Sequence, residues 1–219
     1  MEVTCDLVLP CRDEAAALAD LLPRVPGPWR VIVVDNGSRD GTARVAERFG
    51  ARVLEEPTPG YGAAVHAGVL ASDATFVAVM DGDGSFDPAE LAPLLAAVRT
   101  GDADLAVGRR RPVGPGVWPW HARWGNAVVV AWLRRRIGLP VHDIAPIRVC
   151  RRDAVLALGV TDRRFGYPVE LLDRAVRAGW RLREFDVGYH PRAAGTRSKV
   201  SGSVRGTLRT ARDFARVLA

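Results

Sequence analysis

Short apolar segments recur through the first half of the chain, and each is followed by a polar turn and a segment with helical character. The segment 31–34 is a continuous β-branched run, which is typical of a strand covered on both faces of a parallel sheet. The other expected strands cover 7–10, 52–54, 76–80 and 105–107, and the expected helices cover 13–22, 42–49, 63–71 and 88–99. This alternation predicts an α/β fold with a doubly wound, mostly parallel sheet flanked by helices, whose ligands bind at the carboxyl ends of the strands.

The second half of the chain is less regular. We expect helices near 125–137 and 168–178, a strand near 181–187, a basic loop over 189–203 and a final helix over 203–218. The segment 112–124 is rich in Pro, Gly and Trp, which indicates an ordered loop over a cleft. Because no repeat or low-complexity linker divides the 219 residues, the sequence predicts a single domain over 1–219.

The expected strand at 76–80 runs directly into two aspartates, Asp81 and Asp83. Carboxylates this close repel each other and favour protonation of one of them, unless a cation binds between them. A calcium-binding EF-hand loop is excluded, because Phe86 and Ala92 occupy the positions that require Gly and Glu. The D-x-D motif therefore predicts a hard divalent ion, Mg²⁺ or Mn²⁺, that takes its remaining ligands from substrate phosphates.

Other nucleotide-binding motifs are weak or absent. The sequence contains no G-x-x-x-x-G-K-[ST] phosphate-binding loop. The pair Gly60-x-Gly62 lacks the third glycine of a dinucleotide fingerprint, so it gives only weak support to a Rossmann enzyme.

Charge is distributed unequally between the two halves. Residues 1–108 carry 8 basic and 17 acidic side chains, whereas residues 109–219 carry 23 basic and 8 acidic ones. Arginine accounts for 30 of the 31 basic residues, but a general bias toward arginine would affect both halves alike. The split indicates an acidic half that holds a metal and a basic half that binds anions.

Several segments together resemble a known family. They are "VVDNGSRDGT" (33–42), "GYGAAVHAG" (60–68), "VMDGDGSFDP" (79–88), "AVGRR" (106–110), "DIAPIRVCRRDAV" (143–155), "YPVELLDRAVRAGW" (167–180) and "PRAAGTRSKVSG" (191–202). Nearly the whole chain is similar to family 2 glycosyltransferases of the GT-A fold, and most of all to the dolichol- or polyprenyl-phosphate mannose and glucose synthase branch. One departure is Ala145-Pro146-Ile147, where relatives often have Gly-Pro-Phe or Gly-Phe.

The resemblance implies roles for individual residues. Within a nucleotide-sugar half over 1–110, the donor would be bound by Pro10, Arg12, Glu14, Asp35, Asn36, Gly62, Asp81 and Gly82. The metal ligands would be Asp81 and Asp83, with Ser85 as a third. Phosphates of the donor or the acceptor would be bound by Arg110, Arg123, Arg192, Arg197, Ser198 and Lys199. The candidate catalytic carboxylates in the acceptor half over 111–219 are Asp143 and Glu170.

The resemblance also implies a reaction. The enzyme would transfer a hexose from a UDP- or GDP-linked donor, with inversion and with Mg²⁺ or Mn²⁺ on the leaving diphosphate. A phosphate acceptor, such as a polyprenyl phosphate, is already anionic and needs no general base, whereas a hydroxyl acceptor would use Asp143.

Alternatives remain open at the sequence level. One alternative is a sugar-phosphate nucleotidyltransferase, which also uses a nucleotide and Mg²⁺ on a related sheet, although "LVLPCRDEAAAL" lacks the Gly-rich, Arg- or Lys-bearing loop that normally follows its first strand. Another is a non-catalytic subunit that binds nucleotide sugars and anions. A nucleic-acid-binding module would explain the arginines but not the motifs around Asp35 and Asp81. Three carboxylates have structural alternatives: a turn cap for Asp35, an ion pair with Arg148 for Asp143, and an ion pair with Arg174 for Glu170.

The location of the protein is also predicted from patterns. The sequence shows no signal-peptide pattern, no apolar run of about 18 residues, and three cysteines without metal-binding spacing, which favours a cytoplasmic protein. In the expected C-terminal helix, an apolar stripe lies beside a basic stripe, and the two comprise Val204, Leu208, Ala211, Ala215 and Leu218, and Arg205, Arg209, Arg212 and Arg216. This helix would either pack on the domain or contact an anionic membrane peripherally at its inner face.

Overall fold

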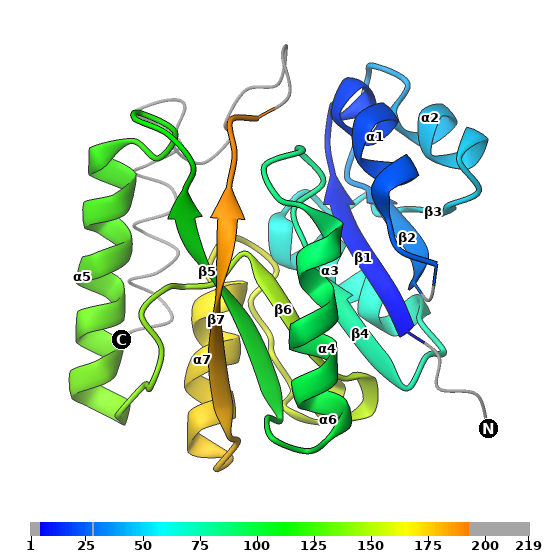
Figure 1. The fold of residues 1–219 in the computed structure, drawn as a ribbon. Coiled ribbons are helices and arrows are strands. Elements are labelled where there is room, and N and C mark those ends of the chain that lie inside the picture. The colour runs from blue at the N-terminus through cyan, green and yellow to red at the C-terminus, as the bar shows by residue number, and fades with distance from the viewer. Residues whose placement is uncertain (1–4, 28, 193–219) are drawn as a thin grey trace.

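The computed structural model describes residues 5–27 and 29–192. A mixed seven-stranded sheet lies at its centre, with the strand order β3-β2-β1-β4-β6-β5-β7 (Figure 1). The strands are β1 (Cys5–Cys11), β2 (Trp29–Asp35), β3 (Arg52–Glu55), β4 (Phe76–Val79), β5 (Leu105–Pro112), β6 (Ile147–Arg151) and β7 (Leu182–Tyr189). All neighbouring pairs are parallel except the two that β6 makes with β4 and β5. The predicted α/β fold with a mostly parallel sheet is therefore confirmed.

Helices cover both faces of this sheet (Figure 1). They are α1 (Ala15–Leu21), α2 (Thr42–Arg48), α3 (Tyr61–Ala71), α4 (Leu91–Arg99), α5 (Trp120–Ile137), α6 (Arg152–Ala157) and α7 (Tyr167–Arg177), with short 3-10 turns at Leu22–Arg24 and Pro88–Glu90. Along β1, Leu7 and Leu9 face the core shared with α1 and α4, whereas Val8 faces the core shared with α3 and α7. Because successive side chains of a strand point to opposite faces, one continuous apolar strand serves both cores.

The structure contains one strand that the sequence did not predict. β6 runs antiparallel between β4 and β5, with Ala78 opposite Val149 on one side and Ala106 opposite the same residue on the other. The short helix α6 follows it directly. The position of β6 in the sheet depends on pairing with strands about 40 and 70 residues earlier, which local patterns do not encode.

The boundaries differ most after β5. The loop predicted over 112–124 is wrong in extent, because α5 begins at Trp120, immediately after Pro119. Trp120 and Trp124 therefore lie on a helix and only Trp118 lies in the connecting segment. None of the helices in the described part of the chain is both long and apolar enough to cross a membrane. The basic loop beyond Arg192 and the expected C-terminal helix lie outside the described residues.

Candidate active site

The carboxyl ends of β1, β2 and β4 meet at one edge of the sheet. Cys11 at the end of β1 lies opposite Asp35 at the end of β2, and the Met80 amide donates a hydrogen bond to the Val8 carbonyl across 3.2 Å. Asp81 and Asp83 follow Met80 directly, so they lie at the edge where a doubly wound sheet binds its ligands. The D-x-D motif therefore lies at the carboxyl end of a strand, as the sequence predicts.

The loop that carries the two aspartates is fixed by close packing and by its own hydrogen bonds. A Cβ atom on Gly82 would lie 2.4 Å from the Sγ atom of Cys11, so only glycine allows the loop to approach β1 this closely. Asp83 accepts a hydrogen bond from the Ser85 amide at 3.1 Å and another from the Ser85 hydroxyl. Both Asp83 and Ser85 are buried, which limits the orientations available to the carboxylate.

The end of β7 brings a third charged group to this loop. The His190 amide donates to the Ser85 carbonyl at 2.9 Å, and this contact holds the segment after β7 beside the D-x-D loop. Arg192 Nε then lies 2.9 Å from Asp83 Oδ2, in a largely buried ion pair. The Asp83 carboxylate is therefore already paired with a positive side chain from the end of β7.

Neighbouring charges have opposite effects on the pKa of Asp81. Burial and the neighbouring Asp83 carboxylate raise the pKa of Asp81 to about 6, although the positive charges of Arg192, Arg148 and Arg110 act in the opposite direction. The described residues include no group of three or more His, Cys, Asp or Glu side chains that could hold a metal ion by themselves. Two carboxylates beside a serine therefore fit an ion that completes its coordination with substrate phosphates.

The raised pKa predicts a pH-dependent metal affinity. A carboxyl group whose pKa is higher in the folded chain than in the unfolded chain contributes stability at low pH, and this contribution is lost as the pH rises through about 6. A bound cation must displace that proton, so we expect Mn²⁺ to bind about tenfold more weakly at pH 5 than at pH 7.5. Calorimetric Mn²⁺ titrations measure this, with Asp81→Asn as the variant that has no proton to displace. Equal affinity of the wild type at both pH values would contradict the assignment of Asp81.

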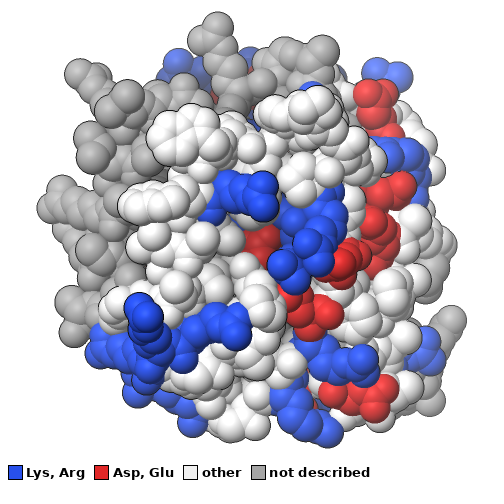
Figure 2. All heavy atoms as spheres, turned by 60° about the vertical axis from the view of Figure 1, so that its left-hand side comes forward, with Lys and Arg blue, Asp and Glu red and all other residues white. Residues whose placement is uncertain are grey.

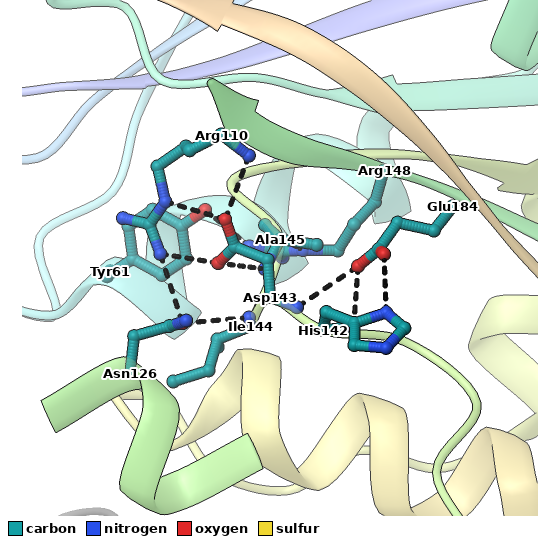
Figure 3. Close-up of polar contacts among 9 residues, drawn as sticks. All are labelled: Tyr61, Arg110, Asn126, His142, Asp143, Ile144, Ala145, Arg148 and Glu184. Carbon is teal, nitrogen blue, oxygen red and sulfur yellow. Dashed lines mark hydrogen bonds and ion pairs between the residues drawn. The ribbon is translucent and has the colours of Figure 1, made fainter. Parts of the chain in front are cut away.

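A second cluster surrounds Asp143 (Figure 3), and its Arg110 is one of the positive charges that act on Asp81. Asp143 is only 1% exposed, and its Oδ2 atom accepts hydrogen bonds from the backbone amide and Nε of Arg110, both at 2.9 Å. Arg110 Nη2 lies 2.5 Å from Asp143 Oδ1, which completes a bidentate ion pair. The guanidinium also lies 4.2 Å from the ring centroid of Trp118. The alternative predicted for Asp143, an ion pair with Arg148, is wrong because Arg110 on β5 is its partner.

Side chains from distant parts of the chain hold this cluster in place (Figure 3). Asn126 on α5 accepts a hydrogen bond from Arg110 at 3.2 Å and another from the Ile144 amide at 3.0 Å. Glu184 on β7 accepts hydrogen bonds from the backbone amides of His142 and Asp143 at 2.6 and 3.1 Å. Sequence reasoning did not identify Asn126 or Glu184, and no local motif marks either of them.

Arg148 occupies a separate position, on β6. Its side chain is buried, with Nε donating to the Ala145 carbonyl at 2.6 Å and Nη2 donating to the Tyr61 hydroxyl at 3.0 Å. Ala145 adopts a positive φ of 62°, a conformation that favours glycine. Arg148 adds a third positive charge near Asp81 that sequence reasoning did not assign to the site.

Glu170 makes a different set of contacts. It lies on α7 and accepts hydrogen bonds from the Thr161 amide and hydroxyl, the Asp162 amide and Arg174 Nε. Its burial acts to raise its pKa, but these donors outweigh that effect and lower it. The ion pair with Arg174 that was the structural alternative is present at 2.7 Å. None of the described hydrogen bonds of Glu170 reaches Asp81 or Asp143.

The residues expected around the donor base shape the neighbouring loops. Asp35 accepts a hydrogen bond from the Ser38 amide at 2.8 Å, so the predicted turn cap is present. Asn36 donates to the carbonyls of Glu56 and Thr58 at 2.8 Å each and accepts from the Gly60 amide at 2.9 Å. These contacts hold the loop that leads into α3 beside the end of β2.

The remaining candidates fall into four groups. A Cβ atom on Gly62 would lie 2.7 Å from the Asp162 carbonyl oxygen, so this glycine allows α3 to pack against the loop before α7. Pro10 is the last but one residue of β1, Arg12 is exposed just after the strand, and the buried Glu14 directly precedes α1. Arg123 is exposed on α5. Arg197, Ser198 and Lys199 lie outside the described residues.

The chain is similar to known glycosyltransferases. The model of the family described as "Glycosyl transferase family 2" matches residues 6–156. An uncharacterized glycosyltransferase of Mycobacterium tuberculosis (strain ATCC 25618 / H37Rv) is 56% identical over 214 residues, with 97% of each chain covered. An undecaprenyl-phosphate mannosyltransferase of Micrococcus luteus is 36% identical over 191 residues, which cover 80% of this chain and 77% of the relative.

The solved structures extend this likeness to the fold. Glucosyl-3-phosphoglycerate synthase from Mycobacterium tuberculosis, in complex with Mn²⁺, UDP-glucose and phosphoglyceric acid, superimposes with a TM-score of 0.76. The two chains are 24% identical, and the match covers 98% of this chain and 78% of the synthase. The predicted GT-A fold is confirmed, and glycosyl transfer replaces the nucleotidyltransferase alternative. The chain belongs to glycosyltransferase family 2.

Proposed function

We propose that the protein transfers a hexose from a nucleoside-diphosphate sugar to the phosphate of a polyprenyl phosphate. The observation that carries this proposal is the arrangement of charge: the positive charges of Arg110, Arg148 and Arg192 act on Asp81, and Arg192 also pairs with Asp83 at the same edge of the sheet. A donor diphosphate with its cation and an acceptor phosphate are two anions side by side, and they need this much fixed positive charge. Relatives named for polyprenol and undecaprenyl phosphates support the same acceptor class.

The donor half of the site would hold the nucleotide sugar and the metal. We assign Asp81 and Asp83, with Ser85, to a Mn²⁺ or Mg²⁺ ion that acts as a Lewis acid on the leaving diphosphate. The structural neighbour in complex with Mn²⁺ and UDP-glucose supports this pairing of metal and donor. Arg192 would exchange its contact with Asp83 for the donor phosphates, so that the same side chain neutralises the carboxylate first and the leaving group afterwards. Asp35 and Asn36 would shape the loops around the base.

The state of Asp143 favours an anionic acceptor over a hydroxyl. Both carboxylate oxygens accept hydrogen bonds from Arg110, and one also accepts from the Ala145 amide at 3.2 Å. A general base must be free to accept a proton from the nucleophile, whereas Asp143 is held by a permanent cation. We therefore assign Asp143 to positioning Arg110 and assign the Arg110 guanidinium to the acceptor phosphate. A phosphate oxygen attacking opposite the leaving diphosphate in one displacement would invert the anomeric carbon.

Glu170 is assigned a positioning role in this scheme. Its hydrogen bonds fix the turn at Thr161 and Asp162, and that turn packs against Gly62 at the start of α3. Since polyprenyl chains are held in a bilayer and nucleotide sugars are dissolved, we place the reaction at the cytoplasmic face of the membrane.

A direct assay tests the proposal. Purified protein is incubated with radiolabelled UDP-glucose or GDP-mannose, Mn²⁺ or Mg²⁺, and either undecaprenyl phosphate or 3-phosphoglycerate. We expect label to enter the organic phase only with the lipid phosphate and to need the divalent cation. NMR of the first-formed product should show an inverted anomeric centre. Transfer to 3-phosphoglycerate alone would replace the proposed acceptor by a soluble phosphate, and a retained configuration would exclude the single displacement.

A further inference from the structure

The outer face of α5 carries exposed aromatic side chains on successive helical turns. Trp120 and Trp124 are 80% and 67% exposed, and Val128, one turn farther along, is also exposed. Residues four apart lie on the same face of a helix, so the three side chains form one apolar stripe. A contiguous exposed apolar surface on a folded domain marks a site of interaction with another molecule or with a membrane.

The stripe is not needed for the core of the domain. The buried residues of α5 are Asn126, Val130 and Leu133, which lie on the opposite side of the helix from Trp124 and Val128. Asn126 supports Arg110 and the Ile144 backbone on this inner side. The helix lies at the edge of the molecule, beyond β5 (Figure 1). Its outer face can therefore contact a partner without any rearrangement of the sheet.

The charge of α5 indicates the chemistry of that partner. The helix contains no Asp or Glu, but it contains Arg123, Arg134, Arg135 and Arg136. The segment 112–119 that leads into it has no charged residue, and Val113 within it is exposed. The side of the molecule that carries α5 comes forward in Figure 2, where blue side chains gather beside white surface at the lower left and the red ones lie farther to the right. Tryptophan and arginine side chains without acidic neighbours are suited to a partner that presents negative charge at its surface and an apolar layer below that charge.

We propose that the outer face of α5, formed by Trp120, Trp124, Val128 and Arg135, docks on an anionic phospholipid bilayer. Tryptophan suits the boundary between headgroups and acyl chains, because its ring is apolar and its N–H can still be hydrogen-bonded. Arginines near the surface are attracted to anionic headgroups, and each one strengthens binding about fivefold. A helix that lies in the membrane plane in this way does not span the bilayer.

The docking surface and the proposed acceptor site lie on opposite sides of the same helix. Arg110 is held on the inner face of α5 through Asn126, and Trp118, just before the helix, stacks against the same guanidinium. A bilayer on the outer face of α5 would keep the protein at the membrane, with Arg110 on the other side of this helix. The docking itself does not depend on the acceptor, so it can be tested with vesicles that contain no polyprenyl phosphate.

The test is flotation of the full chain with vesicles of phosphatidylcholine alone or with about one third phosphatidylglycerol. We expect the wild type to bind the anionic vesicles and to be released by salt. Trp120→Ala/Trp124→Ala should weaken binding at least about tenfold, because two apolar anchors are lost. Arg134→Ser/Arg135→Ser should weaken it about 25-fold, from fivefold for each charge.

Matched controls remove exposed groups of the same kinds elsewhere. Phe49→Ala/Leu70→Ala removes two exposed apolar side chains, one just after α2 and one on α3, and Arg44→Ser/Arg48→Ser removes two arginines of α2. Both controls should bind as the wild type does, and circular dichroism should show that every variant is folded. Wild-type binding by the tryptophan variant, or failure of the wild type to bind anionic vesicles, would overturn the proposal. Self-association without vesicles that the same variant abolishes would assign the face to a second copy instead.

The outcomes separate this proposal from the proposed function. Vesicle binding without transfer to polyprenyl phosphate would support the docking surface and contradict the proposed acceptor. Transfer to polyprenyl phosphate in detergent, by a protein that does not bind vesicles, would support the proposed acceptor and contradict the docking surface.

Discussion

Replacement of Asp83 by alanine is expected to reduce the rate of sugar transfer at least about 1000-fold and to abolish metal-dependent binding of the donor. Asp83 Oδ1 accepts hydrogen bonds from Ser85, and Oδ2 pairs with Arg192, so in the proposed site this one carboxylate would position both the metal ion and an arginine for the donor phosphates. Without the metal ion as a Lewis acid on the leaving group, the activation free energy rises by several kcal/mol. Calorimetry with UDP- and GDP-sugars in Mn²⁺, together with initial rates, measures both effects.

Asp87→Ala is the matched control, because it removes a carboxylate from the same loop. Asp87 accepts a hydrogen bond from the Ala89 amide at 3.0 Å and caps the turn at Pro88–Glu90. We expect this variant to lose about 1 kcal/mol of unfolding free energy, as for other helix caps, and to keep its rate within about threefold of wild type. If Asp83→Ala kept Mn²⁺-dependent donor affinity, the metal assignment would fail even with transfer reduced.

The parts of the fold that follow from local patterns could be predicted from the sequence. The strands β1 to β5 each lie over a predicted apolar segment, and for β1, β2 and β4 the reason is that strands buried on both faces must be largely apolar. The D-x-D motif could be placed as well, since it follows a strand whose carboxyl end must lie at the ligand edge of the sheet. These inferences depend on residues within about ten positions of one another.

The contacts that could not be predicted join residues far apart in sequence. Arg148 meets Tyr61 across 87 positions, and Glu184 meets His142 across 42. Proximity in sequence suggested Arg148 as the partner of Asp143. The chain instead turns at Ala145 through a positive φ, and β6 then directs Arg148 toward Tyr61 while β5 supplies Arg110. A buried aspartate in an arginine-rich chain can be expected to form an ion pair, but which arginine it pairs with depends on how the strands are paired.

Removal of the Arg110 side chain is expected to reduce both stability and activity. Arg110→Met leaves Asp143, which is almost completely buried, without its cation, and breaking a buried ion pair from one side costs about 3–5 kcal/mol. The double variant Arg110→Met/Asp143→Asn removes both charges and keeps an acceptor for the Ala145 amide, so most of the lost stability should return. Denaturant unfolding of the two variants and of the wild type measures the recovery.

Activity should not recover with stability. In the proposed site the Arg110 guanidinium, stacked on Trp118, binds the acceptor phosphate, and the double variant has no cation at that position. We therefore expect both variants to transfer at least about 100-fold more slowly than wild type, because a charged hydrogen bond to a buried phosphate contributes about 3 kcal/mol. Arg111→Met on the same strand is the control: its ion pair with Asp186 is half-exposed, so its loss should cost less than about 1 kcal/mol and leave the rate nearly unchanged. A double variant that regains the wild-type rate together with its stability would show that Arg110 acts only by neutralising Asp143, and the acceptor phosphate would then have to be assigned to another cation of the site.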